Sequence, residues 1–298
     1  MSVVDRGRVE MKNLVKNLFI VGLITGSFVF GLSTGVYKHF PFSLVYKIIN
    51  GTPPSTPPWT GRNFHTGIYE EVDIKVTPQT GVYITYGQSN SSNSGVLENK
   101  IFFNTYMSLN QKTYKYKNPS LGGTGYGGSV WGYLGEKLVL KGYHDFVIFS
   151  NTGVGGKSIH SLNKGEFFEY FLKTYIDLLE KYGRVDGILF HQGESDNKPG
   201  IDETYTSGFR EFLKNLDKNG IETPIYLSRV SYCPNKPSNK KIIEQQNFLI
   251  TNYSNIFPGP NTDSLQGLYR IKNNCHFNLL GFEKFSDMWV ESLIKNEK

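Results

Sequence analysis

The amino-acid sequence predicts an α/β domain, a three-layer α/β/α sandwich with a mainly parallel central sheet. Three observations lead to this fold class. Short, nearly continuous apolar runs recur along the chain, as in strands that are buried on both faces. Segments with apolar residues at helical spacing separate them, and strands that alternate with helices favour a parallel sheet. The globular part has roughly 230 residues, which suits one large domain.

The expected strands end in glycine or polar residues, and they lie at 81–87, 145–150, 185–193 and 223–231. Between them, apolar residues recur three and four positions apart, which places them on one face of a helix. In one such segment Phe168, Phe171 and Tyr175 share a face. Helices are accordingly expected at 165–182, 202–219, 238–252 and 279–295.

A different pattern precedes this domain. Residues 1–17 contain four basic side chains before an uncharged apolar stretch at 18–37, "LFIVGLITGSFVFGLSTGVY". A helix of that length spans a bilayer. The basic residues favour a cytoplasmic N-terminus, so a single-pass signal-anchor predicts a membrane-anchored domain that is periplasmic or extracellular. A cleaved signal peptide is the alternative, and it places the domain on the same side of the membrane.

A proline-rich stretch, "NGTPPSTPPWTGR" at 50–62, follows the apolar segment. Such a composition is typical of an extended, semi-rigid spacer. The predicted organisation is therefore a short cytoplasmic basic segment (1–17), a transmembrane helix (18–37), a linker and lead-in (38–79), and the globular domain (80–298).

Composition excludes several functions. The net charge of +6 is spread along the chain, and no Lys/Arg block resembles a nucleic-acid footprint. The two cysteines, Cys233 and Cys275, lack the clustered Cys/His partners of a zinc site. In an exported protein they can form a disulfide, which the sequence leaves open.

Polar or glycine-rich loops follow the predicted strands. In a parallel sheet the carboxyl ends of the strands meet at one edge, where ligands bind. We therefore expect the loops to converge there and to form a site. These loops are Gly87-Gln88-Ser89-Asn90, the stretch 151–158, the stretch 191–196, and the loop that contains His276.

The residues in these loops suit nucleophilic catalysis. Ser89 can serve as a nucleophile if His276 accepts its proton. The N–H groups of Ser89 and Gly156 and the side-chain amide of Gln192 can stabilise an oxyanion. Each residue alone is typical of an ordinary turn or loop. The prediction depends on their joint occurrence after strands.

A phosphate site is the main rival hypothesis, because "NTGVGGKS" (151–158) ends in Gly-Lys-Ser. A P-loop requires a first glycine at the position of Asn151, so the pattern does not match. The "GGTGYGG" stretch (122–128) follows no predicted strand and lacks dinucleotide-binding spacing. We therefore expect no nucleotide, no metal and no cofactor.

Taken together, the loops resemble those of the SGNH hydrolase superfamily, and most closely its sialate O-acetylesterase-like branch of carbohydrate esterases. The resemblance rests on Gly87-Gln88-Ser89-Asn90, on Gly155-Gly156, on Gln192-Gly193-Glu194-Ser195, and on Cys275-His276-Phe277. It covers roughly residues 80 to 296. It implies hydrolysis of an ester, typically O-acetyl on a sugar. By this resemblance Ser89 is the nucleophile and His276 is the base. Gly156 and Gln192 donate hydrogen bonds to the oxyanion. Glu194 holds its loop in place and is not a catalytic acid.

One position departs from this pattern. The family places Asp three residues before the histidine, where this chain has Asn273. An amide can orient the imidazole, but it has no charge to stabilise the imidazolium. Three hypotheses remain open: a Ser–His dyad oriented by Asn273 or a backbone carbonyl, support from another acid such as Asp263, or a catalytically weak or inactive glycan-binding module on the same fold. An O-acyltransferase is a further alternative, because an acyl-enzyme can pass its group to another alcohol.

Overall fold

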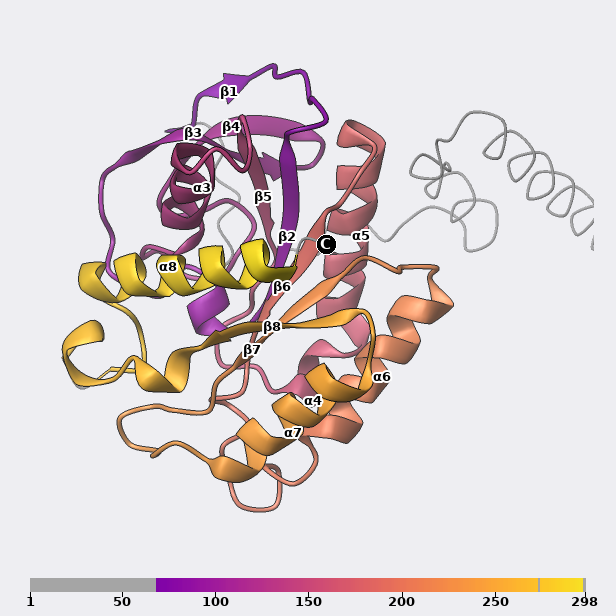
Figure 1. The fold of residues 1–298 in the computed structure, drawn as a ribbon, viewed down its shortest axis with the longest axis vertical. Coiled ribbons are helices and arrows are strands. Elements are labelled where there is room, and N and C mark those ends of the chain that lie inside the picture. The colour runs from indigo at the N-terminus through magenta and orange to yellow at the C-terminus, as the bar shows by residue number, and fades with distance from the viewer. Residues whose placement is uncertain (1–67, 273, 297–298) are drawn as a thin grey trace, which may run out of the picture. The chain divides into compact units, whose positions relative to one another are not determined.

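The computed structural model describes residues 68–272 and 274–296 (Figure 1). The predicted anchor at 18–37 and the proline-rich stretch lie outside these residues. Within the described part of the chain, no helix is both long and apolar enough to span a bilayer.

One eight-stranded sheet organises the described residues, in the order β1-β4-β3-β5-β2-β6-β7-β8. Six neighbouring strands, from β3 to β8, run parallel, whereas β4 and β1 pair antiparallel at one edge. The mainly parallel sheet is therefore confirmed. The strands are β1 (Glu71–Val72), β2 (Gly81–Gly87), β3 (Ile101–Leu109), β4 (Lys112–Lys117), β5 (Val147–Asn151), β6 (Gly187–His191), β7 (Ile225–Arg229) and β8 (Ile256–Asn261).

Helices cover both faces of this sheet, which gives the predicted three layers (Figure 1). One face packs against α3 (Trp131–Leu140) and α8 (Leu279–Asn296). The other packs against α4 (Ile159–Leu162), α5 (Gly165–Tyr182), α6 (Tyr205–Lys218) and α7 (Lys240–Asn252).

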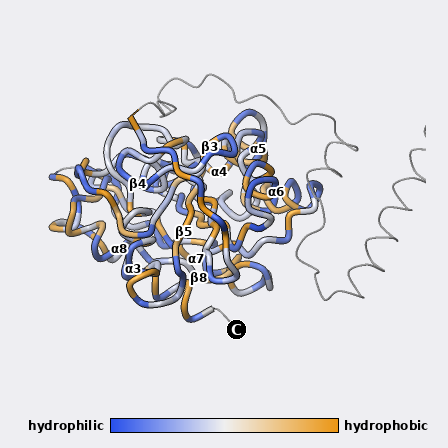
Figure 2. Tube along the Cα trace, turned by 90° about the horizontal axis from the view of Figure 1, so that it is seen from above, coloured by the Kyte–Doolittle hydropathy of each residue, from blue (hydrophilic) through white to orange (hydrophobic). Residues whose placement is uncertain are grey.

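Central strand β2 shows why two separate cores form. Its side chains alternate between the two faces, as the pleat of a strand requires. Val82 and Ile84 join the core under α5, while Tyr83 joins the core under α3 and α8. Both sets are buried, so the strand is apolar almost throughout. Figure 2 shows hydrophobic stretches of the trace at the strands between the helices.

Several elements were not predicted. The hairpin of β3 and β4 turns at Asn110 and Gln111, which both adopt a positive φ. Asn-Gln is not one of the turn pairs that the sequence rules recognise. Strand β8 contains Pro258 and Pro260, which normally indicate a loop. The two prolines are tolerated here because β8 is an edge strand that pairs only with β7.

Gly87 ends β2 at a position that only glycine suits. Its φ is +139°, and a Cβ there would overlap the backbone carbonyl of His191. We expect Gly87→Ala to lower the free energy of unfolding by roughly 3 kcal/mol. Gly142→Ala is the matched control, because φ is +74° there but no atom lies within 4 Å of the added Cβ. Urea unfolding checks the pair, and equal losses in both variants would contradict this account of Gly87.

Candidate active site

The loop after β2 places Ser89 at the carboxyl edge of the sheet. Gln88 N–H donates to the His191 carbonyl at the end of β6 (3.0 Å), and Val154 N–H donates to the Gly87 carbonyl (2.9 Å). Ser89 then begins the short 3-10 helix η2 (Ser89–Ser91) and is 9% exposed. The nucleophile candidate is thus held by the loops after two neighbouring strands.

The glycine loop after β5 lies against Ser89. A Cβ on Gly155 would be 3.9 Å from the Ser89 Cβ. The Gly155 N–H donates to the Thr124 hydroxyl (2.7 Å), which fixes the loop. Gly156 is exposed with φ +70°. Among the described residues, the N–H groups of Ser89 and Gly156 have no hydrogen-bond partner, so both are available to an oxyanion.

Gln192 is less accessible than the sequence suggested. Its side chain is fully buried, and its amide nitrogen contacts three acceptors: the Gln88 side-chain oxygen (3.3 Å), the Lys157 carbonyl (3.2 Å) and the Asp196 carboxylate. An amide has only two hydrogens to donate. Gln192 must therefore give up one of these contacts to serve an oxyanion, and its role as an oxyanion donor stays a prediction.

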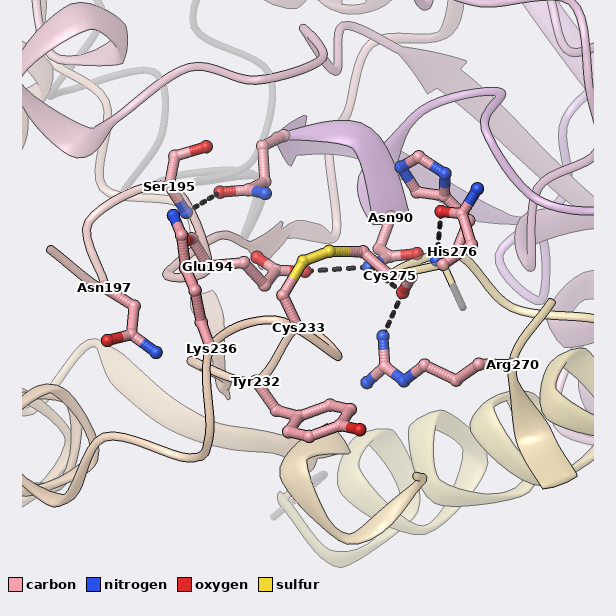
Figure 3. The surroundings of a disulfide bond; sticks show 12 residues. Asn90, Glu194, Ser195, Asn197, Tyr232, Cys233, Lys236, Arg270, Cys275 and His276 are labelled. Carbon is pink, nitrogen blue, oxygen red and sulfur yellow. Dashed lines mark hydrogen bonds between the residues drawn. A yellow bond between two sulfur atoms is a disulfide. The ribbon is translucent and has the colours of Figure 1, made fainter. Parts of the chain in front are cut away.

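A buried hydrogen-bond network joins the nucleophile loop to the histidine loop (Figure 3). The Asn90 side-chain amide donates to the Glu194 carboxylate (2.8 Å) and to the Cys275 carbonyl (3.2 Å). Asn90 directly follows Ser89, and Cys275 directly precedes His276. One side chain therefore connects the loops after β2 and β6 with the loop that contains His276, and the predicted convergence of these loops is confirmed.

His276 lies partly buried in a closed loop. The Ile271 N–H donates to the His276 carbonyl (2.9 Å), and Arg270 pairs with Phe277 as an isolated bridge. Burial, and next the Arg270 charge, lower the pKa of His276 below its ordinary value. No hydrogen bond joins the Ser89 hydroxyl to the imidazole, whose ring nitrogens have no partner among the described residues.

Two residues were considered as partners of this imidazole, Asn273 and Asp263, and the structure describes only Asp263, which does not bond to it. Asn273 lies outside the described residues. Asp263 accepts from Ser231 N–H (2.7 Å), Tyr232 N–H (2.8 Å) and the Ser231 hydroxyl (2.6 Å). It therefore stabilises the loop after β7 rather than His276.

A disulfide joins the loop after β7 to the histidine loop (Figure 3). Cys233 and Cys275 are bonded, with Cα atoms 4.6 Å apart. This answers the question that the sequence left open. The disulfide adds a covalent restraint to the same residue whose carbonyl Asn90 binds.

Sequence reasoning missed two residues of this arrangement. Asn90 was noted only as part of the Gly-Gln-Ser-Asn block, although its place next to Ser89 was a usable signal. Arg270 gave no signal, because a single arginine in a polar loop is normally a solvated surface residue. In the structure it is 4% exposed and bonds to the Cys275 carbonyl.

Glu194 is the buried carboxylate of this network. It is 2% exposed, and burial raises its pKa from its ordinary 4.5 to about 7, against the opposing Asn90 hydrogen bond. The folded protein therefore retains this proton where the unfolded chain has lost it. As pH rises from 4.5 to above 7, the titration of Glu194 should therefore lower the free energy of unfolding by roughly 3 kcal/mol.

The matched variant is Glu194→Gln, which removes the titrating group. Burial lowers the pKa of His191 to about 3, so the titration of His191 makes the fold more stable as pH rises, opposite to Glu194. His191 is present in both proteins, so the quantity to measure is the difference between their free energies of unfolding. We expect wild type to lose stability relative to Glu194→Gln as pH rises through this window, measured by urea unfolding. A pH-independent difference would contradict the buried, protonated state of Glu194.

An α/β sandwich with serine, glycine and histidine loops at the carboxyl edge of its sheet defines an SGNH-type hydrolase. A sequence model of the family described as carbohydrate esterase, sialic acid-specific acetylesterase, matches residues 137–295, and the chain belongs to this family. It lies in the sialate O-acetylesterase-like branch, as the resemblance indicated. The chain is accordingly a carboxylic ester hydrolase, and acetylated carbohydrate is its class of substrate. The match begins after Ser89, so it does not assign the nucleophile.

Solved structures show the same fold. A protein from Arabidopsis thaliana is 16% identical, with a TM-score of 0.58 over 74% of this chain and 99% of that chain. The structure of NanS is 12% identical, with a TM-score of 0.51 over 74% of this chain and 98% of that chain. A comparison with curated proteins finds no significant match.

Proposed function

We propose that the protein removes O-acetyl groups from a carbohydrate through an acetyl-enzyme on Ser89, with His276 as general base and then general acid. The observation that carries this proposal is the Asn90 amide. It bonds the carbonyl directly before His276 while its own residue directly follows Ser89. The loops that carry the candidate nucleophile and base are therefore joined by a hydrogen bond between their neighbouring residues.

In the first half-reaction, the Ser89 hydroxyl oxygen attacks the acetyl carbonyl and its proton passes to His276. The Ser89 and Gly156 N–H groups, with Gln192 as a third donor, stabilise the oxyanion. The intermediate collapses, the bond to the sugar oxygen breaks, and His276 returns its proton to that oxygen. Water then attacks the acetyl-enzyme by the same route, and acetate leaves.

The missing hydrogen bond between Ser89 and His276 is compatible with this mechanism, since catalytic hydrogen bonds often tighten only when substrate binds. A dyad also suits the surroundings of His276, where no carboxylate contacts the imidazole within the described residues. An ester has a better leaving group than a peptide, so it demands less of an imidazolium-stabilising acid.

An acetate-release assay on the full chain in detergent tests the function. The panel should contain O-acetylated sialosides, neutral O-acetylated polysaccharides and a chromogenic acetyl ester. We expect acetate from at least one carbohydrate. Binding without release would favour the glycan-binding module, and acetyl transfer to an added sugar acceptor would favour the acyltransferase.

We also propose that the domain acts outside the cytoplasm, anchored by residues 18–37. The disulfide between Cys233 and Cys275 supports this location, because structural disulfides persist in oxidising compartments. Protease treatment of intact cells is the test. Degradation of the domain without lysis is expected, whereas full protection until lysis would contradict the proposal.

A further inference from the structure

Arg270 is a buried cation that forms no salt bridge among the described residues, although the Glu194 and Asp263 carboxylates lie near enough to favour its charge. All three of its donor groups face backbone carbonyls: Nε bonds Leu265 (2.7 Å), Nη2 bonds Thr262 (3.1 Å) and Nη1 bonds Cys275. Burial still lowers the pKa of Arg270, because a charge without a direct ion pair is costly to bury. Neutral side chains can close a surface loop without burying a charge, so the burial of this guanidinium calls for a functional explanation.

The guanidinium is also held in one orientation. Its carbon lies 4.3 Å from the centre of the Phe277 ring and 5.2 Å from the centre of the Tyr232 ring. Arginine suits such a site because its planar fork can stack and donate several bonds at once. The side chain is therefore rigid, and a rigid donor can position the group that it binds.

That group is the Cys275 carbonyl, which receives two donors. Asn90, next to Ser89, donates from the loop after β2, while Arg270 donates from within the histidine loop (Figure 3). His276 is the next residue along the chain. Its backbone is thus fixed relative to the nucleophile loop through one carbonyl oxygen.

We propose that Arg270 is a positioning residue for the ester hydrolysis: it holds the Cys275 carbonyl, and with it the backbone of His276, in a fixed position relative to Ser89. After burial, which is the larger cause, the Arg270 charge also lowers the pKa of the imidazole. This inference rests on the proposed Ser89–His276 chemistry.

The charged groups around the histidine loop favour this assignment. Lys272 is on the same loop, and Lys236 on the loop after β7 lies 3.5 Å from the Glu194 carbonyl. Asp263 is satisfied by the loop after β7, and burial raises the pKa of Glu194 to about 7. Arg270 is the charge that lowers the pKa of His276, second to burial. His276 therefore stays neutral to lower pH than an ordinary histidine. The acid limb of the rate profile, where kcat/KM falls as His276 is protonated, should lie below pH 6.5.

Two variants of the full chain in detergent separate positioning from charge. Arg270→Lys keeps the charge, but its donors all lie on one nitrogen and cannot reproduce the fork that reaches three separate carbonyls. Arg270→Gln can still donate but is neutral. The readouts are kcat/KM on a small acetyl ester across pH, and circular dichroism for folding. Arg229→Gln is the control, since Arg229 is partly buried and likewise donates to a backbone carbonyl, that of Gly259.

We expect kcat/KM to fall at least roughly tenfold in both variants, because small displacements of a base are costly. The acid limb should stay in place in Arg270→Lys and in the control, and should move toward higher pH in Arg270→Gln. An unmoved acid limb in folded Arg270→Gln, or an undiminished rate in both variants, would overturn the inference. Inert wild-type protein would instead overturn the proposed function.

Discussion

Ser89→Ala is expected to lower kcat on acetyl esters by roughly 10⁵- to 10⁶-fold, close to the loss of all enzymatic turnover. The hydroxyl is the proposed attacking group, and the neighbouring residues offer no replacement nucleophile at the same place. Ser89 is buried at the start of η2, so removing one oxygen should leave the fold intact. The measurement is the initial rate on a chromogenic acetyl ester, together with a thermal melt.

Ser94→Ala is the matched control for this experiment. Ser94 lies on the same loop and is partly buried, but it is not part of the proposed machinery. Its rate should equal that of wild type. Activity of Ser89→Ala within tenfold of wild type would refute the assignment of the nucleophile, whichever carbohydrate proves to be the substrate.

Removing the disulfide should have the second largest effect. The bond closes a loop between residues 42 positions apart, for which the chain-entropy model gives about 4 kcal/mol. In a domain of this size such a loss lowers Tm by roughly 8–16 °C. Because Cys275 precedes His276, we also expect kcat to fall more than substrate binding weakens. The double variant Cys233→Ser with Cys275→Ser is compared with wild type by thermal melt and by kcat and KM.

Reduction provides an internal control. Dithiothreitol should shift wild-type protein toward the double variant and leave the double variant unchanged. If wild type with and without reductant melts at the same temperature as the variant, the disulfide contributes nothing to the fold. If kcat remains at the wild-type value in the variant, the bond does not help to position His276.

The parts of the fold that could be predicted from sequence have local causes. The strand β2 and the helix α5 were predicted to the residue, because their apolar spacing is regular and a glycine marks the end of each: Gly87 ends the strand and Gly183 follows the helix. Strand β8 was missed, since its prolines indicate a loop, and the sequence alone does not show that this strand lies at the edge of the sheet. The hairpin turn at Asn110 and Gln111 was missed for a similar reason, because its residues are unusual for that backbone conformation.

The candidate site divides in the same way. Ser89 and Gly156 were selected because each lies in a loop after a predicted strand, and a parallel sheet brings such loops to one edge. His276 was selected as the histidine of a later polar loop, in a Cys-His-Phe context that resembles the family. The contact from Asn90 to Cys275 joins residues 185 positions apart, and nothing local indicates it. Arg270 is the clearest example of a residue that could not be predicted, since its burial depends on packing against the rings of Phe277 and Tyr232.

Reaction with a fluorophosphonate tests the central claim most directly, because this reagent labels only a serine that a base activates. After labelling of the full chain, peptide mass spectrometry should find the phosphonyl group on Ser89. Labelling should be absent in Ser89→Ala and at least roughly a hundredfold slower in His276→Ala. Labelling at another serine, or an equal rate in His276→Ala, would contradict the pairing of Ser89 with His276.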